Sequence, residues 1–132
     1  MTKKRLRMYK HIKKEYYQIQ QQIVELENAL YSPRVQHLTG MPSAHGPSDA
    51  TENMIDEHKK LIDRYRCIQA ELAAEQLAIE EAIQVLGPVA RMLIRAHYID
   101  GMSWPDVADF IGYSERQTHR LHGAALIELG KE

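Results

Sequence analysis

The chain has 132 residues and a formal net charge of −1, so it can hold one small domain with an extension but not two large cores. This balance of charge excludes a generally basic nucleic-acid binder. The single cysteine, Cys67, excludes an internal disulfide and fits a reducing cytoplasm. No apolar run is long enough to predict a transmembrane helix, and the basic N-terminus leads into amphipathic sequence rather than a signal peptide. We therefore expect a cytoplasmic protein without membrane association.

Residues 2–31 predict one long helix. Its apolar residues recur in alternating steps of three and four, which is the a/d seam of a coiled coil, and no Pro or Gly interrupts it. The seam consists of Tyr9, Ile12, Tyr16, Ile19, Ile23, Leu26 and Leu30. A helix with such a seam needs a partner helix for stability.

A basic cluster opens this first helix. Its members are Lys3, Lys4, Arg5, Arg7, Lys10, Lys13 and Lys14. Two interpretations are open: the cluster pairs with the acidic second helix, or it contacts nucleic-acid phosphates.

Residues 32–50 contain three Pro and two Gly and predict a long mobile loop. His37 and His45 lie in this loop, but they have no nearby cysteine or carboxylate pair and make a poor metal site. The loop is long enough to let the next helix fold back antiparallel on the first.

Residues 51–86 predict the second long helix, with nearly the same heptad phase. Its seam consists of Leu61, Tyr65, Ile68, Leu72, Ile79, Ile83 and Leu86, with polar Glu75 or Gln76 at one step. Cys67 lies beside the seam and is expected to pack as a small residue. The alanine-rich half of this helix should either outrun the first helix or meet a second protomer. We therefore expect a coiled-coil homodimer.

Gly87–Pro88 should end the second helix and form the boundary between a helical hairpin, 1–87, and a C-terminal domain, 88–132. The second domain predicts three helices, from Pro88 to about Ile99, from Trp104 to Ile111 and from Glu115 to Leu129. The whole chain is thus expected to be all-α.

The connections between the helices of this C-terminal domain match those of a helix-turn-helix. Ser103 precedes Asp106 by three residues, and Ser114 precedes Gln117 by three, which are helix-start capping patterns. Gly112 supplies the positive φ that the turn between the last two helices needs.

One small core can gather the apolar residues of this domain, with Trp104 plugging it at the edge. The expected core is Leu93, Ile94, Val107, Ala108, Ile111, Leu121, Ala125 and Leu129. Ala108 and Gly112 are small, as expected where two helices cross closely. The alternative is a three-helix core without a role in DNA binding.

With Thr118 and Leu121 turned inward, four side chains should point outward near the start of the third helix: Glu115, Arg116, His119 and Arg120. Arginine can bind guanine O6 and N7 with two hydrogen bonds, and glutamate can accept from cytosine N4. A recognition helix places its N-terminal residues against base edges in the major groove. The predicted DNA-binding set therefore comprises these four residues together with Ser103, Ser114 and Gln117.

These residues carry a resemblance. The segment MLIRAHYIDGMSW, the small Ala108, Gly112, the cap Ser114 and the ending ALIEL resemble region 4 of the sigma-70 family, a helix-turn-helix that reads promoter −35 elements. The whole chain looks like phage and prophage late-gene activators of the ArpU/RinA-like group. The resemblance implies base reading by Glu115, Arg116, His119 and Arg120, and contact with RNA polymerase, for which Phe110 is a candidate. Sigma factors usually have arginine where this chain has Glu115, and no region 2 is present.

The uneven charge limits how strongly one module can bind DNA. Residues 1–48 carry eight Lys or Arg and three Asp or Glu, residues 49–87 carry four and nine, and residues 88–132 carry five and six. A near-neutral DNA-binding domain should bind weakly by itself, which calls for a dimer or a polymerase partner.

No catalytic motif or cofactor site is evident, so we expect neither an enzyme nor a bound cofactor. His119 and His122 lie three residues apart, but a metal would require His97 to fold in as third ligand. The predicted function is a transcription regulator that binds double-stranded DNA. The alternative is a phage packaging protein similar to a small terminase subunit, although such proteins usually place the helix-turn-helix first.

Overall fold

A computed structural model describes residues 1–31 and 49–131, and within them every regular element is a helix. The all-α prediction is confirmed. Residues 32–48 of the predicted loop, which include His37 and His45, lie outside the described residues. Its last two residues, Asp49 and Ala50, already belong to the second long helix.

The two long helices form close to where the heptad pattern places them. α1 spans Lys3–Tyr31 and α3 spans Asp49–Ala82. A single 3₁₀ turn, η1 at Ile83–Val85, follows α3, and Leu86 is extended with φ −85° and ψ 158°. The α-helix therefore ends four residues before the predicted end at Leu86.

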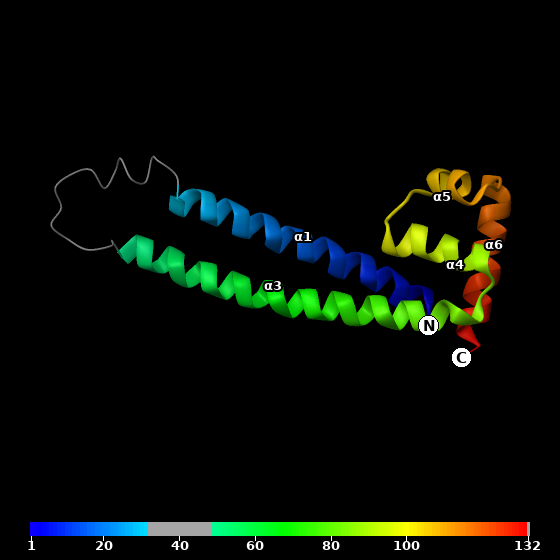
Figure 1. Ribbon diagram of the computed structural model, residues 1–132, viewed down its shortest axis with the longest axis horizontal. Coiled ribbons are helices and arrows are strands. Elements are labelled where there is room, and N and C mark those ends of the chain that lie inside the picture. The colour runs from blue at the N-terminus through cyan, green and yellow to red at the C-terminus, as the bar shows by residue number, and fades with distance from the viewer. Residues whose placement is uncertain (32–48, 132) are drawn as a thin grey trace. The chain divides into compact units, whose positions relative to one another are not determined.

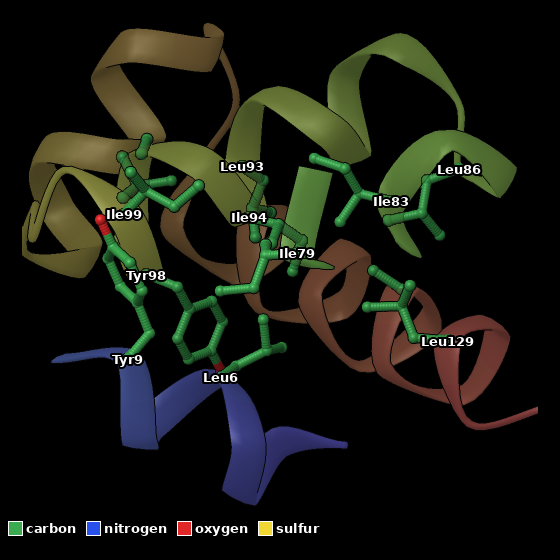
Figure 2. Packing of buried hydrophobic residues seen from close by; sticks show 13 residues of the cluster. Leu6, Tyr9, Ile79, Ile83, Leu86, Leu93, Ile94, Tyr98, Ile99 and Leu129 are labelled. Carbon is green, nitrogen blue, oxygen red and sulfur yellow. The ribbon is translucent and has the colours of Figure 1, made fainter. Parts of the chain in front are cut away.

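The chain divides into two compact units, and the division differs from the predicted boundary at Gly87–Pro88. One unit joins Met1–Lys13 with Glu71–Glu132, and the other is Lys14–Ala70. Packing explains the first unit, because the start of α1 and the end of α3 enter the core of the C-terminal helices (Figure 2). This shared core contains Leu6, Tyr9, Ile79, Ile83, Leu86, Leu93, Ile94, Tyr98, Ile99, Val107, Ala125 and Leu129.

Within the unit Lys14–Ala70, the two helices pair antiparallel through the predicted seams. The Tyr16 and Tyr65 rings stack at 4.9 Å, with their hydroxyls 2.6 Å apart. Further along, His58 Nε2 lies 2.9 Å from Glu27 Oε1. Cys67 is exposed, so the expectation that it packs beside the seam is wrong.

Within the other unit, the start of α1 reaches the alanine-rich part of α3. Arg5 donates to Glu75, with Nε and Oε2 3.2 Å apart, and the Tyr9 hydroxyl donates to Gln76 Oε1 at 3.4 Å. Glu75 and Gln76, the polar residues at the seam of α3, thus each have a hydrogen-bonding partner on α1. Because this part of α3 has intramolecular contacts, the expected overhang is wrong, and the homodimer stays a prediction.

The C-terminal helices follow the predicted bounds closely (Figure 1). α4 spans Pro88–Ile94 and continues as one widened π-helical turn, η2, at Arg95–Ile99. α5 spans Trp104–Ile111 and α6 spans Glu115–Gly130. Pro88 is the first residue of α4, where its missing N–H costs no hydrogen bond.

The turn chemistry between these helices is also as predicted. The Ser103 side chain accepts from the Asp106 N–H, and Ser114 and Gln117 form a reciprocal capping box. Gly112 has φ +79°, which explains the glycine. A β-carbon there would meet no atom within 4 Å, so the idea that Gly112 allows a close helix crossing is wrong. The turn before α5 uses Gly101, with φ +75°, which was not predicted.

The predicted core of the C-terminal helices is largely confirmed. Six of its eight residues are buried, and Ile111 and Leu121 pack against the cluster while half-buried. Trp104 is also half-buried against this cluster.

Candidate nucleic-acid interface

The first turns of α6 present a polar strip to solvent. Glu115, Arg116, His119 and Arg120 are all exposed. Thr118 is fully buried, and its hydroxyl donates to the Ser114 carbonyl at 2.8 Å. This inward threonine fixes the rotation of α6, so the predicted outward face is confirmed as a surface, while its contact with DNA stays a prediction.

The remaining predicted DNA-binding residues have local structural roles. Ser103 and Ser114 cap the starts of α5 and α6, and both are exposed. Gln117 is exposed, and its carbonyl oxygen accepts from the Ser114 N–H at 3.4 Å. Ser103 thus sets where α5 begins, and Ser114 and Gln117 set where α6 begins and which amides its N-terminus leaves open.

A concave basic site adjoins the polar strip and was not predicted. We call it the basic pocket; it has a volume of about 280 Å³. Four segments of one compact unit contribute its lining: Lys3, Arg7 and Lys10 from α1, His97 and Tyr98 from η2, Trp104 from α5, and His119 and His122 from α6. His119 belongs to both surfaces, since it lies on the exposed strip and lines the pocket.

A buried hydrogen bond forms the back of the pocket. The Tyr98 hydroxyl and His122 Nε2 are 2.6 Å apart. Burial, followed by the charges of neighbouring histidines and cations, lowers the pKa of His122 to about 4, and burial raises the pKa of Tyr98. At neutral pH the phenol and the imidazole are therefore both uncharged, and a single O–H or N–H hydrogen joins them.

His97 is held in one tautomer by its two partners. The Met102 carbonyl can only accept, so His97 Nδ1–H donates to it at 2.9 Å. The Lys10 ammonium can only donate, so His97 Nε2 accepts from it at 3.2 Å. Burial first, and Lys10 among other charges, lowers the pKa of His97. The Trp104 ring stacks on the His97 ring, with the two centroids 3.8 Å apart. The His97 side chain is therefore held by its two hydrogen bonds and by this stacking.

The widened turn η2 places these wall residues. The Asp100 N–H donates to the Arg95 carbonyl and the Met102 N–H to the Ala96 carbonyl, both at 2.9 Å. These bonds span five and six residues instead of four, and π-helical turns occur frequently at functional sites. The turn lets Tyr98 enter the core while His97 faces the pocket.

The basic cluster of α1 divides among three kinds of contact. Arg5 pairs with the acidic second helix, as the first interpretation expects, and Lys13 donates to the Ile99 carbonyl at 2.6 Å. Lys10 is bound to His97. Lys3 and Arg7 line the basic pocket, and within the described residues no ion pair involves either of them.

The three histidines do not form a metal site. Among residues 1–31 and 49–131, no group of three or more His, Cys, Asp or Glu side chains is arranged to hold a metal ion. The geometry agrees, because His122 is bonded to Tyr98 and both ring nitrogens of His97 have partners. The three histidines of the C-terminal helices were the sequence signal for this part of the pocket. The α1 residues that complete the pocket, Lys3, Arg7 and Lys10, could not be predicted from sequence spacing.

Comparison of the chain with protein-family models, with curated proteins and with solved structures finds no match. None of the helices in the described part of the chain is both long enough and apolar enough to span a membrane. The polar strip and the basic pocket are the features of the described residues that bear on function.

Proposed function

We propose that this protein is a transcription regulator that binds double-stranded DNA in a sequence-specific manner and reads it with α6. The observation that carries the proposal is the polar strip. Four hydrogen-bonding side chains are exposed on the first turns of a capped helix, and that helix follows a shorter helix through a three-residue glycine turn. Such an arrangement is typical of a helix-turn-helix recognition helix and supports the proposal.

The residue types of the strip suit base reading. Arg116 and Arg120 can each bind guanine O6 and N7, and Glu115 can accept from cytosine N4. His119 can contact a base edge or a phosphate. The open amides and the positive end of the α6 dipole favour a nearby phosphate. Each of these contacts becomes available when the start of α6 enters the major groove.

The resemblance to sigma-70 region 4 and to phage late-gene activators extends this proposal to partners. Phe110, the candidate for RNA polymerase contact, is 54% exposed, and solvent-exposed aromatic residues are enriched in protein interfaces. A homodimer would supply a second reading helix and compensate for the modest charge of one module. Polymerase contact and dimerisation are both parts of the proposal.

The test is selection of bound duplexes from a random pool, followed by affinity measurements on the enriched site. We expect Arg116→Ala and Arg120→Ala each to weaken binding by about 1–3 kcal/mol and to relax specificity at one base pair. The matched control is Arg64→Ala, which removes an exposed arginine of α3 and should leave affinity unchanged. If both strip variants bind the selected site like the parent protein, α6 does not read the DNA.

The mass of the protein in solution tests the class of regulator. A dimer on two half-sites fits a transcription regulator. A ring of eight or more subunits would instead favour the packaging alternative and would count against the proposed regulation.

A further inference from the structure

We infer that the basic pocket is a phosphate-binding site, and that its occupant is a backbone phosphate of the DNA strand alongside α6. The inference rests on the proposed function, because it assigns the source of the phosphate to DNA. It adds a second contact surface, formed by the first turns of α1, to the reading helix.

The lining of the pocket carries one sign of charge, and within the described residues no ion pair involves Lys3 or Arg7. Lys3, Arg7 and Lys10 line it, and no carboxylate of the described residues does. Elsewhere in the same unit, Arg5 has an acidic partner in Glu75. A cleft lined by one sign of charge concentrates counter-ions, and Arg and Lys are the side chains that proteins use most to bind phosphate oxygens. Lys3 and Arg7 can therefore donate hydrogen bonds to an anion bound in the pocket.

The walls of the pocket are fixed before any ligand arrives. The Tyr98–His122 hydrogen bond and the stacking of Trp104 on His97 hold the aromatic wall. Lys10 is tethered by its hydrogen bond to His97. Binding then has to order only the exposed side chains of Lys3 and Arg7, which lowers its entropic cost.

The position of the pocket favours the DNA backbone over a base. His119 lines the pocket and also belongs to the polar strip, so the pocket lies along one edge of that strip. The major groove is about 12 Å wide, so a helix inside it has a sugar-phosphate backbone along each side. A site at the edge of the reading surface meets phosphates, and phosphate contacts fix the register of a protein on the duplex.

The test compares two charge-matched double variants on the selected duplex. Lys3→Gln with Arg7→Gln removes the open cations of the pocket. Lys4→Gln with Lys14→Gln removes two exposed lysines of α1 that do not line the pocket. Dissociation constants are measured over a range of salt concentrations, and Trp104 fluorescence during urea unfolding checks that both variants are folded.

We expect the salt slope of binding to fall by about 0.9 for each phosphate that the pocket variant no longer neutralises, on selected and scrambled duplexes alike. The control variant should keep the parental slope. A scan with single methylphosphonates, which neutralise one phosphate at a time, should find a position that weakens the parent protein but not the pocket variant. Equal slopes for the pocket variant and the parent, or an equal fall in both double variants, would overturn the inference.

A titration with inorganic phosphate separates this inference from the proposed function. Trp104, the only tryptophan, lines the pocket and should report phosphate by a change in fluorescence that the pocket variant lacks. If no duplex is bound but this change occurs, the DNA function fails and the site takes a free phosphorylated ligand. If neither occurs, both proposals are overturned.

Discussion

The stability of the unit Met1–Lys13 with Glu71–Glu132 should depend on pH through His122. This side chain is only 7% exposed and its pKa is lowered to about 4, against an ordinary value of about 6.5. The folded protein therefore resists protonation at this site, whereas the unfolded chain takes up the proton below pH 6.5. His122 makes no pH-dependent contribution above pH 6.5, and the free energy of unfolding falls as pH decreases from 6.5 to 4.

The magnitude follows from the shift. One pKa unit corresponds to about 1.4 kcal/mol, so the full loss between pH 6.5 and pH 4 is about 3 kcal/mol. The pKa of His97 is lowered as well, which adds a loss of the same sign. A loss of this size is a large fraction of the stability of a small unit.

The assay is equilibrium urea unfolding between pH 7.5 and pH 4.5, followed by the fluorescence of Trp104, which lies in this unit. His122→Gln keeps an amide that can donate to or accept from the Tyr98 hydroxyl, but it cannot titrate. It should remove about one proton from the pH dependence of stability, or about 1.4 kcal/mol per pH unit in the steep region. His11→Gln, at an exposed position of α1, is the control and should keep the parental slope. An unchanged slope in His122→Gln, or titration of His122 near pH 6.5 by NMR, would refute the reasoning.

Three other predictions concern the C-terminal helices and the end of α3, and urea unfolding checks each of them. Gly112→Ala should lower the free energy of unfolding by about 1 kcal/mol, because φ is +79°, whereas Gly123→Ala should raise it by about 0.5–1 kcal/mol, because this helical position has open space for a β-carbon. Equal effects at both glycines would contradict the backbone argument. Ser114→Ala should cost about 1 kcal/mol through loss of the capping box, and an unchanged midpoint would refute that role. Glu80→Gln should remove a loss of stability that occurs only below about pH 4.5, since the hydrogen bond from Arg95 lowers the pKa of Glu80; a change between pH 5 and 7 would contradict this.

Local signals predicted the helices well because their causes are local. Pro88, Ser103, Gly112 and Ser114 act through their own backbone or through neighbours three residues away, so the bounds of α5 and the start of α6 follow from spacing alone. The heptad steps likewise predicted which faces of α1 and α3 are buried.

The division of the chain was not predictable in the same way. Leu6 lies three residues before Tyr9, one position away from the heptad phase, and spacing does not show that it packs against the C-terminal helices. The same holds for the basic pocket, where Lys3 and Arg7 meet His119 across most of the length of the sequence. The exposed face of α6 was predicted, because helical periodicity and an inward Thr118 suffice for it.

One hydrophobic core draws on the first thirteen residues and on residues from Glu71 onward, and this has a consequence for how the protein is made. On the ribosome, Leu6 and Tyr9 emerge early, but the core that they share is complete only after Leu129 has been synthesised. Contacts across so long a sequence separation slow folding, because a long loop must close before they form. A fragment that begins at Pro88 would lack Leu6, Tyr9, Ile79 and Ile83. The C-terminal helices in that fragment would expose the apolar face that these four residues cover in the full chain.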